Sequence, residues 1–131
     1  MSTTTLRLDT SSSGIRTFHH SEFTLDRLLD AKGATSVSVC LPARNEAATV
    51  GSIVRTLRTE LLESGVIDEI VVLDDHSTDD TARVASDAGA RVADAASVLT
   101  DFGGGHGKGE VLWKSLHVTE GDLVLWCDSD I

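Results

Sequence analysis

The sequence predicts one α/β domain built on a mostly parallel, doubly wound sheet. Four short apolar runs alternate with helical segments, which is typical of strand–helix–strand units. The run at 69–73 is almost continuously apolar, as expected of a strand covered on both faces. The length of 131 residues suits a single domain, and a hydrophobic content of 40% is enough for a modest core.

An arm is predicted to precede the sheet. Residues 1–16 are rich in Ser and Thr and are expected to be mobile. A short helix is predicted over 24–32, with apolar residues on one side and Gly33 as its stop. We therefore divide the chain into an arm at 1–33 and a domain at 34–131.

The first strand is predicted over 37–41, ended by Pro42. Apolar residues then recur at spacings of three and four, which predicts a helix over 46–63 with one apolar face. The second strand follows at 69–73.

The second half of the domain continues the alternation. Ser77 resembles a helix N-cap, followed by acids in the first turn, so a helix is predicted from there to Ala88. A short strand is expected at 90–93. A glycine-rich loop at 103–109 then opens another helix, and the last strand is predicted at 122–127.

Charge and composition exclude several classes of protein. The formal net charge of −10 argues against a nucleic-acid partner, which needs a basic face. No apolar run is long enough to span a membrane, and the polar start lacks a signal-peptide core, which favours the cytoplasm. Cys40 and Cys127 each lie in an apolar run and are expected to be free thiols.

Candidate site residues follow the predicted strands. In a doubly wound sheet, ligands bind beyond the carboxyl ends of the strands. Four segments should meet at that edge: 42–46, 74–77, the loop around Lys108, and 128–130.

The first of these segments has two interpretations. Pro42 fixes the backbone, so that the groups after it can face a ligand. Asn45 and Glu46 could then bind a base, a ribose or an anchoring loop. Alternatively, the segment is a plain turn with Asn45 as the helix cap.

The second segment carries two adjacent acids. Asp74 or Asp75 could accept a hydrogen bond from a ribose or base, as acids after a second strand do in dinucleotide folds. In the alternative, Asp74 caps the turn and Asp75 is solvated. His76 is expected to be a loop residue.

The glycine-rich loop fits neither of two phosphate-binding patterns. The spacing required for a Walker A loop fails, and a dinucleotide-binding fingerprint should follow the first strand. Lys108 at a helix start could still meet a diphosphate. The alternative is a mobile surface loop.

The triplet Asp128-Ser129-Asp130 directly follows the last apolar run. Carboxylates at a strand end suit Mg²⁺ or Mn²⁺ bound to a diphosphate, because hard cations prefer oxygen ligands. Side chains two apart alternate across the strand, so both acids reach one metal only if the chain turns at Ser129. We therefore expect Asp130 to bind the metal and Asp128 to contact the sugar or ribose. The alternative is an acidic turn.

Together, the motifs Leu41-Pro42-Ala43-Arg44-Asn45-Glu46, Val72 to Thr81 and Asp128-Ser129-Asp130 resemble the nucleotide-sugar half of a GT-A glycosyltransferase. The segments 107–116 and 18–32 narrow the resemblance to the glucosyl-3-phosphoglycerate synthases. The resemblance covers about residues 17–131.

The resemblance implies a retaining transfer of glucose from UDP-glucose to 3-phosphoglycerate, with Mg²⁺ or Mn²⁺ on the diphosphate. It also implies the binding roles of ten residues. The uridine side would be lined by Pro42, Ala43, Arg44, Asn45 and Glu46; Asp75 would touch the nucleotide, Lys108 would lie near the base or diphosphate, Asp128 and Ser129 would contact the donor, and Asp130 would hold the metal.

Two departures from the family pattern accompany the resemblance. Asp75-His76 stands where these synthases usually have Ser-Gly, and Arg44 replaces a usual apolar residue. The family's C-terminal half, with acceptor-binding residues and much of a homodimer contact, has no counterpart here, so the chain is expected to be a truncated product, nearly inactive alone. The alternatives are a family-2-like transferase with another nucleotide sugar and a lipid-phosphate acceptor, or a non-catalytic remnant.

Overall fold

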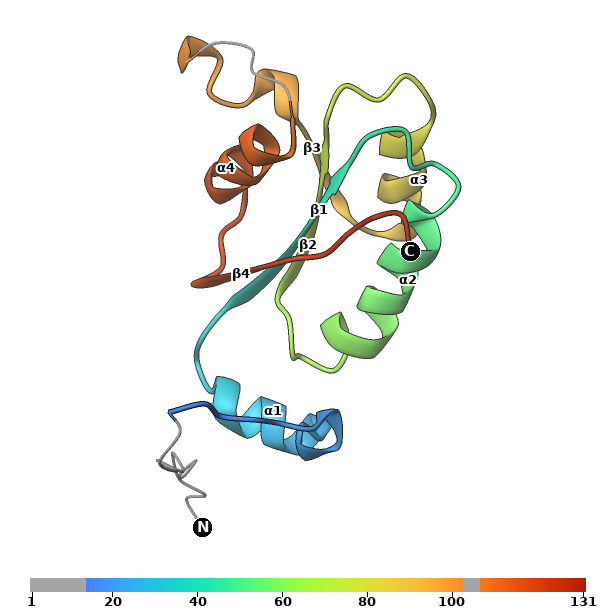
Figure 1. The fold of residues 1–131 in the computed structure, drawn as a ribbon. Helices are drawn as coiled ribbons and strands as arrows, with labels where there is room; N and C mark the ends of the chain where they lie inside the picture. Colours follow the sequence, from blue (N-terminus) through green and yellow to red (C-terminus); the bar gives the residue numbers. More distant parts are fainter. Residues whose placement is uncertain (1–13, 103–106) are drawn as a thin grey trace.

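The computed structural model describes residues 14–102 and 107–131 (Figure 1). Four parallel strands form one sheet in the order β3-β2-β1-β4. Their bounds are Val37–Ala43 for β1, Glu69–Asp74 for β2, Arg91–Asp94 for β3 and Leu123–Trp126 for β4. The predicted parallel sheet is therefore confirmed.

Helices cover both faces of this sheet (Figure 1). Helices α2 and α3 lie on one face and α4 on the other, while α1 lies beyond the amino ends of the strands. Their bounds are Leu25–Lys32 for α1, Val50–Leu57 for α2, Thr81–Ala88 for α3 and Lys108–Val118 for α4, with a π-helical turn at Arg58–Leu62 and 3₁₀ turns at His20–Glu22, Ala95–Ser97 and Thr100–Phe102. The sheet is thus doubly wound, as predicted.

The two central strands carry most of the core. Val39 and Leu41 of β1 pack with Val50 and Val54 of α2 on one face. Cys40 points to the other face, where it packs near Val111 and other buried residues. Burial raises the pKa of the Cys40 thiol to about 11, so this thiol stays protonated.

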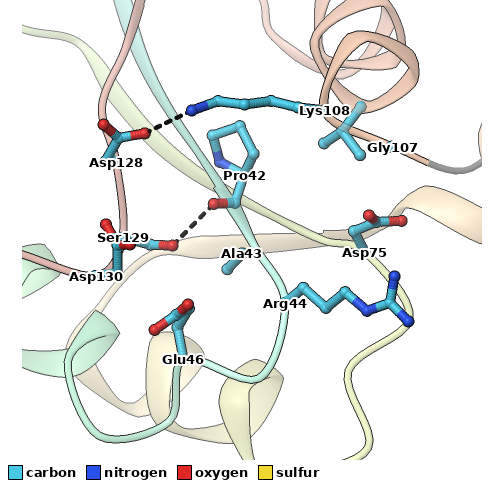
Figure 2. A pocket seen from close by; sticks show the side chains of 11 residues that line it. Pro42, Ala43, Arg44, Glu46, Asp75, Gly107, Lys108, Asp128, Ser129 and Asp130 are labelled. Carbon is cyan, nitrogen blue, oxygen red and sulfur yellow. Dashed lines mark hydrogen bonds and ion pairs between the residues drawn. The ribbon is translucent and has the colours of Figure 1, made fainter.

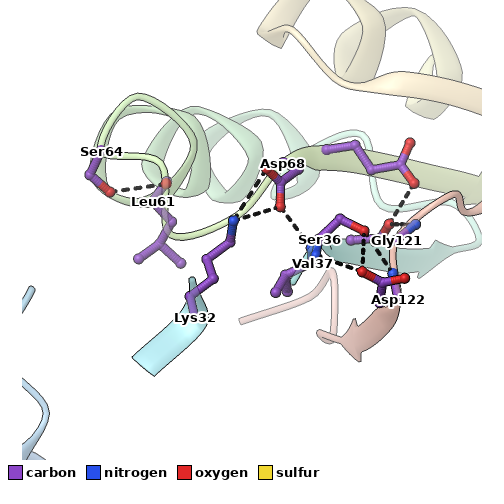
Figure 3. Close-up of polar contacts among 10 residues, drawn as sticks. Lys32, Ser36, Val37, Leu61, Ser64, Asp68, Gly121 and Asp122 are labelled. Carbon is purple, nitrogen blue, oxygen red and sulfur yellow. Dashed lines mark hydrogen bonds and ion pairs between the residues drawn. The ribbon is translucent and has the colours of Figure 1, made fainter. Parts of the chain in front are cut away.

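Polar contacts join the amino ends of the strands (Figure 3). Asp68 accepts a hydrogen bond from the Val37 N–H at 2.7 Å and pairs with Lys32 at 3.0 Å. Asp122 accepts from the Ser36 N–H at 2.9 Å. These N–H groups are the largest cause that lowers the pKa of each carboxyl below its usual value. The helix predicted at 24–32 is confirmed, with Thr24 as its N-cap.

The prediction that Pro42 ends the first strand is wrong. Strand β1 runs on to Ala43, and Pro42 lies opposite Leu73 of β2. The Cys40 carbonyl accepts a hydrogen bond from the Cys127 N–H on the β4 side, and the Ala43 carbonyl accepts one from the Asp75 N–H on the β2 side. The position at which proline lacks an N–H therefore faces the β4 side of the sheet, where pairing with β4 has already ended.

Two helix starts also differ from prediction. The helix expected from Glu46 begins at Val50 and is preceded by a turn at 47–49, in which the Glu46 carbonyl accepts from the Thr49 N–H at 3.1 Å. The helix expected to be capped by Ser77 begins at Thr81 instead. The Ser77 hydroxyl accepts a hydrogen bond from Asn45 and is not available as a cap.

Strand β3 is shifted by one residue relative to the predicted 90–93, and β4 lacks one residue at each end of the predicted 122–127. The predicted mobile segment and glycine-rich loop fall partly at 1–13 and 103–106, which lie outside the described residues. Within 14–102 and 107–131, no helix has the length and apolar character needed to cross a membrane.

Candidate functional site

A pocket of about 310 Å³ lies at the carboxyl edge of the sheet (Figure 2). It brings together all four segments that the sequence placed at that edge. Its lining consists of Pro42, Ala43, Arg44, Glu46, Asp75, Gly107, Lys108, Val111, Asp128, Ser129 and Asp130. Of the ten residues to which the resemblance gives binding roles, all except Asn45 line this one pocket, whereas Gly107 and Val111 were not among them.

Asn45 anchors the loop after β1 instead of facing the pocket. Its backbone has a φ of 55°, a left-handed conformation that asparagine tolerates better than most residues. Its N–H donates to the Ser77 hydroxyl at 2.9 Å, and its side-chain oxygen accepts from the Thr78 N–H at 2.8 Å. The interpretation of Asn45 as a helix cap is thus wrong, and the anchoring alternative is correct.

Two further residues, missed by sequence reasoning, hold the same loop. The buried Thr81 hydroxyl accepts from the Glu46 N–H at 2.8 Å and donates to Asp79. Asp79 in turn accepts from the Ala47 N–H at 3.2 Å. The Thr81 hydroxyl is the largest cause that holds the pKa of Asp79 below its usual value. The cluster of polar residues at 77–81 is the feature of the sequence that could have indicated these anchoring hydrogen bonds, but the sequence analysis interprets it as a helix cap.

Asp75 is a buried wall of the pocket, with only 8% of its surface exposed. The alternative in which Asp75 is solvated is therefore wrong. One of its carboxylate oxygens lies 2.8 Å from Nδ1 of His76, a residue whose φ is 58°. Asp74 does not line the pocket, and its Oδ1 is buried without a hydrogen-bond partner among the described residues.

Lys108 is the first residue of α4, and its ammonium group forms an ion pair across the pocket (Figure 2). Nζ lies 3.0 Å from Oδ1 of Asp128. The hydrogen bond from Lys108 to Asp128 raises the lysine pKa above its usual value. The lysine therefore remains charged at neutral pH beside the amino end of a helix, where anions bind favourably.

Ser129 fixes the acidic triplet to the rest of the domain. Its hydroxyl donates to the Pro42 carbonyl at 2.8 Å, and its own carbonyl accepts from the Thr49 hydroxyl at 2.6 Å. Both flanking carboxylates line the pocket, but their contacts differ. Asp128 pairs with Lys108, whereas Asp130 makes no hydrogen bond or ion pair with any described residue.

The donor set suits a hard divalent cation only in part. Asp128 and Asp130 offer carboxylate oxygens, the ligand type that Mg²⁺ and Mn²⁺ prefer. Among the described residues, however, no group of three or more His, Cys, Asp or Glu side chains is arranged to hold a metal. One or two carboxylates are sufficient where water and substrate phosphates complete the coordination, so the residues fit a metal bound together with a diphosphate.

Known proteins resemble the chain over most of its length. The model of the family described as Glycosyl transferase family 2 matches residues 38–131. Glucosyl-3-phosphoglycerate synthase of Petrotoga mobilis is 40% identical over 120 residues, which is 88% of this chain and 37% of the relative. The enzyme of the same name from Mycolicibacterium smegmatis is 46% identical over 109 residues, covering 83% of this chain and 35% of the relative.

Solved structures agree with the sequence comparison. The glucosyl-3-phosphoglycerate synthase of Mycobacterium tuberculosis, in complex with Mn²⁺, UDP-glucose and phosphoglyceric acid, superimposes with a TM-score of 0.78 at 42% identity. The match covers 86% of this chain and 40% of that one. A further structure of that enzyme holds Mg²⁺ and UDP. The predicted GT-A type of fold and the resemblance to these synthases are thereby confirmed, and the chain spans well under half the length of the relatives it matches.

Proposed function

The chain belongs to glycosyl transferase family 2, and on this premise we propose that it forms the nucleotide-sugar-binding half of a glucosyl-3-phosphoglycerate synthase. In the complete enzyme, glucose moves from UDP-glucose to the 2-hydroxyl of 3-phosphoglycerate with retention of configuration. Residues 34–131 are the donor-binding half, and 1–33 form the arm that precedes it.

The observation that carries this proposal is the gathering of the predicted donor-binding residues around one pocket. These residues come from the ends of β1, β2 and β4 and from the start of α4. The M. tuberculosis enzyme, which matches over the same part of the chain, binds UDP-glucose, Mn²⁺ and phosphoglyceric acid.

The residues divide into a nucleotide side and a diphosphate side. Arg44, Glu46 and Asp75, with Pro42 and Ala43, line the side proposed to hold the uridine. Asn45 contributes by shaping that loop, since it does not line the pocket.

On the diphosphate side, Lys108 neutralises phosphate charge, and Asp128 and Ser129 contact the donor. Asp130 is the proposed ligand of Mg²⁺ or Mn²⁺, because its carboxylate is not engaged by any described residue. When bound, such a metal acts as a Lewis acid that stabilises the charge of the leaving UDP.

The alternative of another nucleotide sugar with a lipid-phosphate acceptor is less well supported, because the relatives at 40–46% identity are named glucosyl-3-phosphoglycerate synthases. The homodimer and the cytoplasmic location inferred from the sequence remain predictions.

A donor competition series tests the proposal. With Mn²⁺ present, the chain is expected to bind UDP-glucose more tightly than UDP-GlcNAc or GDP-mannose, as measured by calorimetry. A preference for GDP-mannose would contradict it. Transfer to 3-phosphoglycerate is expected only from a protein of the relatives' length, because this chain spans 37% of the P. mobilis enzyme. Glucosyl transfer by the 131-residue chain alone would refute that part.

Two substitutions test the split roles of the acidic triplet. Asp130→Ala is expected to abolish Mn²⁺-dependent binding of UDP-glucose, because it removes the proposed metal ligand. Asp128→Ala is expected to keep metal binding and to weaken donor binding by about tenfold, a loss typical of one charged hydrogen bond. Equal losses of Mn²⁺ affinity in both variants, measured by electron paramagnetic resonance, would show that both acids bind the metal.

A further inference from the structure

Helix α4 contains a lysine whose side chain is buried. The side chain of Lys114 is only 2% exposed, whereas that of Lys108, at the start of the same helix, is 71% exposed. Nζ of Lys114 donates a hydrogen bond to the Ala95 carbonyl at 2.8 Å and lies 3.8 Å from Oε1 of Glu110. Ala95 directly follows β3, so this contact ties the middle of α4 to one edge of the sheet.

The neighbouring residue ties α4 to the opposite edge. The Ser115 hydroxyl accepts a hydrogen bond from Nε1 of Trp126 at 2.8 Å and donates one to the Leu112 carbonyl at 2.6 Å. Trp126 is the last residue of β4, and the order β3-β2-β1-β4 puts β3 and β4 at the two edges of the sheet. Lys114 and Ser115, which we call the α4 anchor, therefore hold the helix from both sides.

Stability alone does not explain a buried lysine at this place in the helix. Replacing a buried ion pair with apolar residues of similar size is often neutral or stabilising, and buried polar groups are better known for fixing the register of a helix. The hydrogen bond from Lys114 to Ala95 is directional. It therefore sets where α4 lies along the sheet, which the apolar packing of residues such as Val111 constrains less.

The α4 anchor lies next to the first turn of the helix, which belongs to the pocket. Gly107, Lys108 and Val111 all line the pocket, and Val111 lies three residues before Lys114. Figure 2 shows Lys108 reaching across the pocket toward Asp128. A shift of α4 along the sheet would therefore displace both the cation and the amino end of the helix, the two features that favour a bound anion.

We propose that Lys114 is a positioning residue for the donor diphosphate, because its hydrogen bond to Ala95 holds the first turn of α4, and with it Lys108, at the diphosphate side. This inference rests on the proposed function and deepens it. Lys114 is buried and does not line the pocket, so it acts through Lys108 and not by contact with the donor. Its effect is expected on the binding of the second phosphate and not on the uridine side.

The test measures the ratio of UDP affinity to UMP affinity with Mn²⁺ present, because these nucleotides differ only in the second phosphate. Lys108→Met sets the scale and is expected to lower the ratio by about tenfold, a loss typical of one charge-assisted hydrogen bond. Lys114→Met keeps the length of the side chain and removes the donor to Ala95. It is expected to lower the ratio by about threefold or more, whereas a variant that is only less stable would lose affinity for both nucleotides equally.

Two further variants and a control separate positioning from general destabilisation. In Lys108→Met/Lys114→Met, the second substitution should lower the ratio by less than it does alone, because the lysine through which it acts is already absent. Trp126→Phe removes the Nε1–H donor on the β4 side of the α4 anchor and should also lower the ratio. Lys32→Met removes a lysine paired with Asp68 at the amino ends of the strands, and this matched control should leave the ratio unchanged.

The outcomes distinguish this inference from the proposed function. Failure of the wild-type chain to bind any nucleotide would overturn both. If the wild type binds UDP and Lys114→Met weakens UDP and UMP equally, the positioning role is wrong and the proposed function stands. An equal effect of Lys114→Met with and without Lys108 would also overturn it. If the thermal midpoint shows that Lys114→Met is unfolded, Trp126→Phe decides, because an unchanged ratio there would refute the α4 anchor.

Discussion

The two sides of the pocket differ in how the chain holds them. On the nucleotide side, the loop after β1 is tied to the segment 77–81 by hydrogen bonds from consecutive backbone N–H groups. The strands beneath it, β1 and β2, are paired on both edges. On the diphosphate side, the acidic triplet follows β4, an edge strand in which Leu125 is 50% exposed.

This difference shows that the nucleotide side is organised within the described part of the chain. Its loop cannot move without breaking several hydrogen bonds at once. The diphosphate side depends mainly on Ser129, which joins the triplet to Pro42 and Thr49. The proposed base site is therefore firmly anchored, whereas the proposed metal site follows an edge strand in which Leu125 is half-exposed.

The largest expected effect contrasts the centre of the sheet with its edge. Leu41→Ala on β1 should lower the free energy of unfolding by about 2–5 kcal/mol, because Leu41 is fully buried. Leu125→Ala on β4 should cost less than about 1 kcal/mol, because half of its surface is already exposed. Urea denaturation measures both values. Similar losses in the two variants would show that β4 is covered in solution and would remove the contrast.

A smaller effect is expected from the loop of the nucleotide side. Thr81→Val keeps the shape of the side chain but removes the acceptor for the Glu46 N–H, at an expected cost of about 1–3 kcal/mol. Affinity for UDP should fall as the loop loosens, while Mn²⁺ binding is unchanged. Thr56→Val on the exposed face of α2 is the control. Unchanged UDP affinity in Thr81→Val would mean that the anchoring hydrogen bonds do not organise the base site.

The smallest expected effect is on the stability of the fold at acidic pH. The pKa of Asp79 is lowered in the folded chain, chiefly by the Thr81 hydroxyl. Its stabilising contribution is therefore present above the ordinary carboxyl pKa of about 4 and is lost as the pH falls through the lowered value. Asp79→Asn should flatten the acid limb of the stability curve, measured as the urea midpoint against pH. A slope as steep as that of the control Asp30→Asn would contradict this assignment.

Sequence reasoning was most successful where it depended on strand ends. The alternation of apolar runs predicted the parallel sheet, and parallel strands place their carboxyl ends at one edge. That geometry alone places Pro42, Asp75 and Asp128 around the same pocket. Sequence reasoning failed at Ser77, because a serine before a helical segment looks like a cap even when its hydroxyl binds a backbone N–H more than thirty residues away.

The sequence by itself determined the order of elements, the edge at which the site lies and the oxygen-rich chemistry of the acidic triplet. These depend on periodicity and residue type, which are local properties. Only the tertiary structure decided that Asn45 anchors a loop, that Asp75 is buried beside His76, and that Ser129 joins the triplet to Pro42. Each of these depends on a hydrogen bond or a degree of burial that is fixed when segments distant in the chain pack together.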